Sequence, residues 1–148
     1  MPPYFDINID IMKPKLLIGT NNKDKFKEIR AILKDLEVEL LSLSDLGLEL
    51  KVEEDGRTYS ENATKKALAF SQASGLPSLA DDSGLEVEVL GGKPGFHSNR
   101  FGHPLGDGLG RTDATRRAYL LMQLNGNPRP WVAKFRATVA IASPGRGV

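Results

Sequence analysis

Two adjacent carboxylates, a hydroxyl and a glycine follow a short apolar stretch near the middle of the chain, where residues 79–84 read Leu-Ala-Asp-Asp-Ser-Gly. A short apolar run that is bounded by Pro and Gly is typical of a buried strand. Successive residues of a strand point to opposite faces, so Asp81 and Asp82 are not both simple surface charges if the strand end is covered on both sides. Buried carboxylates are costly unless they are paired, and a divalent cation is a suitable partner. The same residues are also typical of a plain turn, and this alternative stays open.

Any metal that this chain binds would be held by oxygen atoms. The chain has no cysteine, which excludes thiol catalysis, disulfides and thiolate sites, and its two histidines, His97 and His103, lack ligand spacing. Oxygen ligands favour magnesium or manganese over zinc. The acidic run at residues 53–55 is typical of a solvated loop, but it can also supply a ligand to the same cation as Asp82.

A polar turn at residues 20–22 separates an apolar strand, predicted at residues 15–19, from a helix. The helix is predicted from apolar residues at spacings of three or four: Phe26, Ile29, Leu33 and Leu36. Asn22 is a plausible N-cap, and a helix start directs free N–H groups and a positive dipole end toward one point, which suits an anion. Lys23 and Lys25 add positive charge that opposes this dipole, so we expect an anion nearby. An ordinary connection with two solvated lysines is the alternative.

A second helix, from residue 59 to about residue 74, is predicted to place a lysine in the interior. Residues 58–61 read Thr-Tyr-Ser-Glu, a capping box with Thr58 as N-cap, and Gly75 ends the helix. The predicted inner face holds Tyr59, Ala63, Ala67, Phe70 and Ala73. Lys66 lies at the centre of that face, with Asn62 one turn before it, whereas Lys65 falls on the outer face. An inward lysine needs an anionic partner, unless its head escapes to solvent.

The remaining elements complete one mixed α/β domain. We predict strands at residues 37–42, 85–89 and 131–141, and a helix that starts after Thr112 and ends at Gly126. The chain has 148 residues and a net charge of +1, so it suits one domain and offers no general electrostatic case for binding nucleic acid or a membrane. No signal peptide or spanning stretch is visible, and we expect a cytoplasmic location.

Three motifs in order resemble the inosine/xanthosine triphosphate pyrophosphatase family. They are residues 18–25 (Ile-Gly-Thr-Asn-Asn-Lys-Asp-Lys), residues 58–63 (Thr-Tyr-Ser-Glu-Asn-Ala) with Lys66, and residues 79–87 (Leu-Ala-Asp-Asp-Ser-Gly-Leu-Glu-Val). The third motif continues at residues 90–95 and 98–101. Each motif alone is weak, but the ordered set is specific and covers roughly residues 15–142.

The resemblance implies an elongated mixed α/β fold with two lobes and a cleft between them. It implies hydrolysis of non-standard purine nucleoside triphosphates (ITP, dITP, XTP) to the monophosphate and pyrophosphate with Mg²⁺, or with Mn²⁺, by a homodimer. Carried over by position, Asp82 is expected to be the catalytic carboxylate near the metal, with Glu54 as a metal ligand and Asp81 in support. The residues expected to bind the triphosphate are Thr20, Asn21, Asn22, Lys23, Lys25, Lys66 and Ser83.

Both ends of the chain depart from the family pattern. Residues 1–14 are expected to be an N-terminal extension, with the domain at residues 15–148. The family continues past the last strand into a Gly-Phe-Gly-Tyr-Asp loop, a helix and a Ser-His-Arg motif that hold the base, and these residues are not in this sequence. We therefore expect an incomplete domain with weak base selection and an uncovered sheet edge that invites pairing with another chain. The alternatives are a related pyrophosphatase for modified pyrimidine nucleotides, and a chain that binds nucleotide, or merely dimerises, without turnover.

Overall fold

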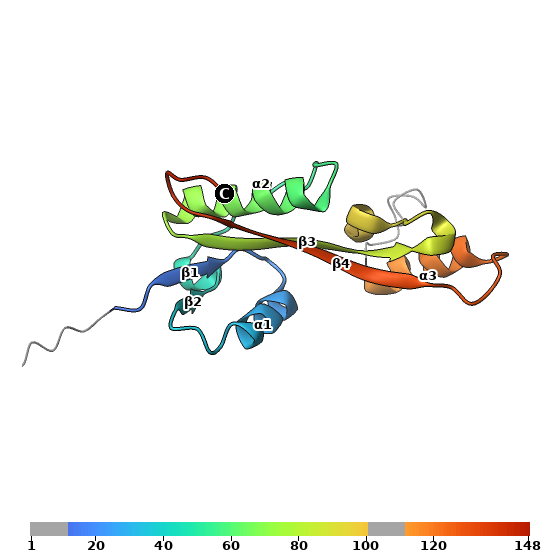
Figure 1. Ribbon diagram of the computed structural model, residues 1–148, viewed down its shortest axis with the longest axis horizontal. Helices are drawn as coiled ribbons and strands as arrows, with labels where there is room; N and C mark the ends of the chain where they lie inside the picture. The colour runs from blue at the N-terminus through green and yellow to red at the C-terminus, as the bar shows by residue number, and fades with distance from the viewer. Residues whose placement is uncertain (1–11, 101–111) are drawn as a thin grey trace, which may run out of the picture.

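The computed structural model describes residues 12–100 and 112–148, apart from the side chains of Asn99 and Arg100. It is a mixed α/β protein, and Figure 1 shows an elongated molecule. The strands are β1 (Lys15–Ile18), β2 (Glu39–Leu41), β3 (Ser78–Val87) and β4 (Ala133–Ala142). The helices are α1 (Lys23–Ile32), α2 (Tyr59–Ser74) and α3 (Asp113–Leu124), with short 3-10 turns η1 (Ser44–Leu46), η2 (Glu88–Leu90) and η3 (Gly95–Arg100). The predicted extension lies outside the described residues up to residue 11, as do Phe101 and His103.

The strands form one mixed sheet in the order β2-β1-β3-β4. β1 is parallel to β2 and β3, whereas β4 is antiparallel to β3 along all ten residues of that strand. The pairing of β1 with β3 ends at Ile18 and Leu79. In the described part of the chain, β3 beyond Leu79 therefore has a neighbouring strand only on the β4 side, and the opposite side is open for a site.

The acidic stretch of β3 is neither a turn nor a strand end. β3 runs without a break from Ser78 to Val87, and β4 pairs with every residue of it. The turn alternative for residues 81–84 and the separate strand predicted at residues 85–89 are therefore wrong. The low strand preference of Asp and Gly is overridden here by tertiary pairing. Beyond Val87 the chain turns into η2.

α2 covers one face of the sheet, as Figure 1 shows. The buried cluster between them combines Phe70 and two leucines with five alanines, and the alanines let the helix pack closely on the strands. Its members are Leu17, Leu43, Ala63, Ala67, Phe70, Ala80, Ala140 and Ala142. The predicted inner face of the helix is confirmed except for Ala73, which is exposed, and Asn62 and Ser71 are buried as well.

The caps of α2 differ from the prediction in one detail. The Thr58 hydroxyl accepts the N–H of Glu61 at 3.1 Å, and Gly75 ends the helix with a φ of 69°. The Glu61 carboxylate accepts the N–H of Arg57 at 2.7 Å rather than that of Thr58. The N-cap and the helix end are therefore confirmed, whereas the reciprocal half of the capping box is replaced by a bond one residue earlier.

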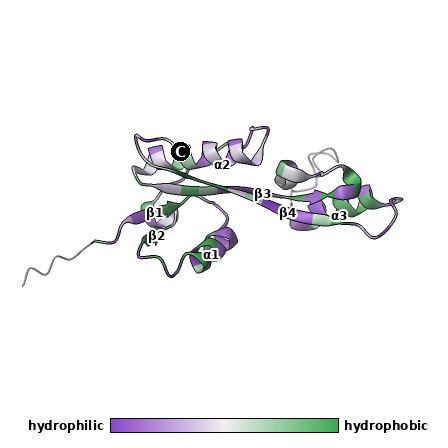
Figure 2. Cartoon of the chain, viewed as in Figure 1, coloured by the Kyte–Doolittle hydropathy of each residue, from purple (hydrophilic) through white to green (hydrophobic). Residues whose placement is uncertain are grey.

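α1 is a surface helix that no residue anchors in the core. None of its residues is buried, and Figure 2 shows that it carries both hydrophobic and hydrophilic residues. It ends at Ile32, so the predicted continuation to Leu36 is wrong, and Leu36 is 52% exposed. β2 is also shorter than predicted, with three residues.

η3 lies in direct contact with the backbone of β3 at Gly84. A side chain at Gly84 would overlap the carbonyl of Gly95, so η3 packs directly on β3. The Ser98 hydroxyl accepts the N–H of Leu85 at 2.9 Å and fixes this contact. Thr112 caps α3 as predicted, and the helix ends at Leu124. Among the helices described, none is both long and apolar enough to cross a membrane.

β4 is an edge strand with an exposed apolar row. The strand predicted at residues 131–141 is present and runs from Ala133 to Ala142. Burial alternates only near its end, where Ala140 and Ala142 are buried while Val139 and Ile141 are exposed. Phe135, Val139 and Ile141 are 84%, 57% and 52% exposed, and we call these three residues the β4 stripe. The sheet order leaves β4 with one strand neighbour in the described part, so the predicted uncovered edge is present.

Candidate active site

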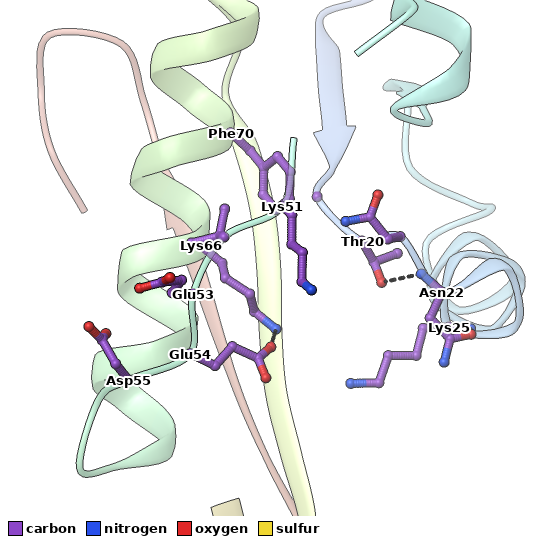
Figure 3. Close-up of a pocket in the computed structure, with 12 residues that line it drawn as sticks. Thr20, Asn22, Lys25, Lys51, Glu53, Glu54, Asp55, Lys66 and Phe70 are labelled. Carbon is purple, nitrogen blue, oxygen red and sulfur yellow. Dashed lines mark hydrogen bonds and ion pairs between the residues drawn. The ribbon is translucent and has the colours of Figure 1, made fainter. Parts of the chain in front are cut away.

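A pocket of about 550 Å³ lies between the turn after β1, the extended segment before α2, and α2 itself (Figure 3). Its lining residues are Gly19, Thr20, Asn21, Asn22, Lys25, Lys51, Val52, Glu53, Glu54, Asp55, Lys66 and Phe70. Gly19 is required here, since a side chain at this position would overlap the ring of Phe70. The pocket therefore brings the turn at residues 20–22 against the face of α2 that carries Lys66.

The turn after β1 is held in place by its own side chains. Asn22 caps α1 as predicted, with its Oδ1 accepting the N–H groups of Asp24 at 2.9 Å and Lys25 at 3.1 Å. Thr20 Oγ1 accepts the N–H of Asn22 at 3.1 Å, and Asn21 donates to the carbonyl of Leu50 at 3.1 Å. Two of the N–H groups that the sequence offered to an anion are thus capped internally. An anion bound at this turn would therefore contact side chains rather than the N–H groups of Asp24 and Lys25.

Lys25 reaches from α1 to the middle of β3. Its Nζ donates to Asp81 Oδ2 at 2.7 Å and to Ser83 Oγ at 2.9 Å. Asp81 and Ser83 are two residues apart on the strand and therefore share one face. Lys23 does not join this cluster: it is exposed and lines a neighbouring pocket of about 630 Å³ on the other side of the turn.

Asp82 points to the opposite face of β3, toward α2. Asn62 of α2 donates from Nδ2 to Asp82 Oδ2 at 3.0 Å, and both side chains are buried. The Asn62 carbonyl oxygen accepts the N–H of Gly56 at 2.8 Å, which ties the acidic loop to the helix. The prediction that the two aspartates face opposite ways is confirmed by these partners.

Lys66 is an interior lysine with a carboxylate partner. Its Nζ donates to Glu54 Oε1 at 2.6 Å, and the two side chains are 14% and 22% exposed. Escape of the amine to solvent, the alternative for this residue, is therefore wrong. Lys65 lies on the outside as predicted, at 43% exposure, and pairs with Asp55.

The surroundings of Asp82 favour the neutral form of its carboxyl more than water does, chiefly because the carboxyl is buried. Burial raises the pKa of the Asp82 carboxyl and the nearby charge of Glu54 adds to this, while the bond from Asn62 and the charges of Lys66 and Lys25 act in the other direction. The pKa of Tyr59 is raised by burial and by the negative charges of Glu86 and Asp82. A buried carboxylate with a raised pKa is a stronger base than a solvated one, as a residue that accepts a proton from water needs.

The three predicted metal ligands do not converge on one point, because Asp81 and Asp82 point to opposite faces of β3. Within residues 12–100 and 112–148, no three acidic or histidine side chains lie close enough to hold a metal ion. Mg²⁺ bound with a nucleotide needs only one or two carboxylates, since phosphates and waters complete its coordination. Of the three predicted ligands, Glu54 and Asp82 are near enough to each other for the charge of Glu54 to raise the pKa of Asp82. Asp81 faces the other way and is paired with Lys25.

Two residues of the site carry roles that the sequence reasoning did not assign. Asn62 was noted only as the neighbour of Lys66, yet it is the residue that holds Asp82. Lys51 lines the pocket and was not singled out at all. The available signal was its position two residues before the acidic run at residues 53–55.

These features define a mixed α/β protein whose pocket gathers lysines, amides and carboxylates suited to a phosphorylated ligand. The profile of the Ham1 family matches residues 16–148, and the chain belongs to that family. It is 46% identical over 132 residues to a protein of Geobacter sulfurreducens named dITP/XTP pyrophosphatase, an alignment that covers 88% of this chain and 64% of that relative. A relative of the same name from Desulforamulus reducens is 44% identical over 132 residues, or 88% of this chain and 63% of the relative.

Solved structures agree with this assignment. A HAM1 protein from Coxiella burnetii superposes with a TM-score of 0.72 at 32% identity, over 86% of this chain and 62% of that one. The Ham1 protein of Staphylococcus aureus gives a TM-score of 0.70, also at 32% identity, over 88% of this chain and 64% of the other. The chain thus spans a little under two thirds of the length of the curated relatives and structures it matches.

Proposed function

We propose that this protein hydrolyses non-standard purine nucleoside triphosphates, such as ITP, dITP and XTP, to the monophosphate and pyrophosphate. The observation that carries the proposal is the arrangement of Asp82 and Asn62 behind a pocket that Lys25, Lys66 and Glu54 line. Membership of the Ham1 family supports it, and so do the names of relatives that are 44–46% identical. The cytoplasm, which holds the nucleotide pool, is the location we infer for this activity.

In the proposed reaction, the triphosphate binds along the turn at residues 20–22, with its charge balanced by Lys25 and Lys66. These cations stabilise the negative charge that grows in the transition state. Asp82, oriented by Asn62, accepts a proton from a water molecule. The water oxygen forms a bond to the α phosphorus, the bond from that phosphorus to the oxygen bridging the α and β phosphates breaks, and pyrophosphate leaves with that electron pair.

Magnesium is the cofactor that these residues fit best, with Glu54 and Asp82 as the side chains that would hold it. When bound, the ion neutralises phosphate charge and orients the phosphate chain. Asp81 is better suited to hold Lys25 in position than to bind the same ion, because it lies on the other face of β3.

We also propose that two copies associate through the β4 stripe. An apolar row on an edge strand is the feature that supports this, because burial of such a row removes it from water and an edge strand accepts a further strand.

The proposed activity is tested by a substrate panel on the 148-residue chain with MgCl₂: ITP, dITP, XTP, ATP and a modified pyrimidine triphosphate, with pyrophosphate and orthophosphate measured separately. Pyrophosphate release from the inosine and xanthosine nucleotides supports the proposal. Orthophosphate release, or turnover confined to the pyrimidine nucleotide, would contradict it. Because the chain spans less than two thirds of its relatives, nucleotide binding without turnover is the second candidate, and calorimetric titration of ITP separates it from no binding.

A further inference from the structure

Lys51 belongs to the extended segment that forms one wall of the pocket. Burial alternates along this segment: Leu50 and Val52 pack against the core, whereas Lys51 is exposed to the pocket. The carbonyl of Leu50 also accepts a bond from Asn21 at 3.1 Å. The backbone on both sides of Lys51 is therefore anchored, and the direction of its side chain is set by the period-two alternation.

The three lysines that line the pocket differ in the hydrogen-bond and ion-pair partners of their side chains. Lys25 is bonded to Asp81 and Ser83, and Lys66 is bonded to Glu54. Among the described residues, Lys51 has no carboxylate within ion-pair distance. Figure 3 shows its amine in the space between Lys66 and the turn at Thr20, while Glu53 and Asp55 are directed elsewhere. Lys51 is thus the cation of this pocket that can bind an anion without first giving up an internal partner.

We propose that Lys51 is a specificity-determining residue that binds the polyphosphate chain of the substrate and favours nucleotides with more than one phosphate. The inference rests on the proposed function, because it names a further contact for the same substrate. Lys25 and Lys66 share their charge with carboxylates, so a bound polyphosphate retains negative charge that they do not balance. Lys51 supplies the additional cation, and its contact is lost when the ligand is too short to cross the pocket.

The test is calorimetric titration of the whole chain, without a metal, using sodium tripolyphosphate and orthophosphate as probes. Lys51→Met keeps most of the stem and removes the charge, and Lys34→Met is the matched control, since Lys34 is exposed and lies outside both pockets. We expect Lys51→Met to weaken tripolyphosphate binding about 10-fold at low salt, an effect that shrinks as salt screens the contact. Orthophosphate binding changes much less, Lys51→Arg restores most of the loss, and the thermal melting point is unchanged because no internal contact is removed.

The outcomes separate this inference from the proposed function. If the unaltered chain binds tripolyphosphate and Lys51→Met binds it equally well, the role of Lys51 is wrong while the proposed function stands. If Lys51→Met binds more weakly but the unaltered chain releases no pyrophosphate from any nucleotide, the role of Lys51 stands and the proposed function is wrong. If the folded, unaltered chain does not bind tripolyphosphate, the role of Lys51 is wrong, while the proposed function is judged separately by pyrophosphate release from nucleotides with MgCl₂.

Discussion

Asn62 donates a hydrogen bond from Nδ2 to Oδ2 of Asp82, 3.0 Å away, across the buried contact between α2 and β3. The same amide accepts the N–H of Gly56 through its oxygen. One asparagine therefore fixes both the carboxylate that we assign to catalysis and the loop that carries Glu54. Removal of this side chain is expected to affect both at once.

Replacing Asn62 with Leu keeps a similar volume but leaves the Asp82 carboxylate and the Gly56 N–H without their partner. Each buried polar group left unsatisfied costs about 1–3 kcal/mol, so for two groups we expect the free energy of unfolding to fall by about 2–6 kcal/mol. The Asn62 bond lowers the pKa of Asp82, so its loss raises that pKa further. The acid limb of any pH–rate profile then moves to higher pH. Urea unfolding measures the stability change, and Gln72→Leu, on the exposed side of α2, is the control. Equal effects of the two substitutions would contradict this prediction.

The raised pKa of Asp82 makes a second prediction about stability. A carboxyl with a higher pKa in the folded state binds its proton more tightly there, so stability falls as pH rises from the unfolded value, about 4, through the folded pKa. At neutral pH the buried charge therefore destabilises the fold. Asp82→Asn removes the charge and keeps an oxygen that can accept from Asn62. We expect the melting temperature of this variant to exceed that of the unaltered chain at pH 7, by about 2–4 °C for each kcal/mol gained. The difference should vanish below about pH 4, and an Asp82→Asn variant that melts lower at pH 7 would refute the account.

Lys66 and Lys65 are neighbours in sequence with opposite surroundings, and so form a matched pair for substitution. Lys66→Met removes the ion pair with Glu54 and a cation from the pocket, whereas Lys65→Met removes an outer ion pair worth at most about 1 kcal/mol. We expect the first change to weaken binding of ITP about 10-fold or more, with little effect on inosine, and the second to change neither. Isothermal titration with both ligands measures this, and equal losses for the two variants would count against an interior Lys66.

The β4 stripe predicts association that depends on apolar contact. Phe135 is 84% exposed, so its replacement with Ser removes apolar surface without disturbing the buried core. We expect the unaltered chain to sediment as a dimer at micromolar concentration and Phe135→Ser to shift it toward the monomer, with an unchanged melting point for the monomer. A substitution at Thr138, on the other face of the strand, is the control. A chain that is monomeric throughout would rule out this interface.

The sequence predicted the local elements well, because their signals are local. The cap at Asn22, the cap at Thr58 and the strand predicted at residues 131–141 depend on spacing within one segment. Both caps are confirmed, and the strand is present from Ala133 to Ala142. Opposite orientations for Asp81 and Asp82 also followed from strand geometry alone. The partners of these side chains could not be predicted in this way, since Lys25 reaches Asp81 over 56 residues and Asn62 reaches Asp82 over 20.

The failures have a common physical cause. Asp-Asp-Ser-Gly has turn propensity, and only β4, more than fifty residues later, makes it part of a continuous strand. The apolar period predicts that the helix beginning at Lys23 continues to Leu36. The helix ends at Ile32 instead, because none of its residues is buried and packing against the core does not stabilise a further turn. Lys51 could not be predicted, because its availability for an anion stands out only once Lys25 and Lys66 are seen to be paired. That pairing is a property of the folded pocket.

The most direct test of the central assignment is pyrophosphate release from ITP with MgCl₂, measured side by side for the unaltered chain, Asp82→Asn and Asp81→Asn. If Asp82 accepts the proton from water, Asp82→Asn lowers turnover by about 10²-fold or more while ITP binding persists. Asp81→Asn, which loosens Lys25, weakens binding more than it slows turnover. Near-full turnover by Asp82→Asn together with abolished turnover by Asp81→Asn would contradict the assignment and give the catalytic role to the other face of β3.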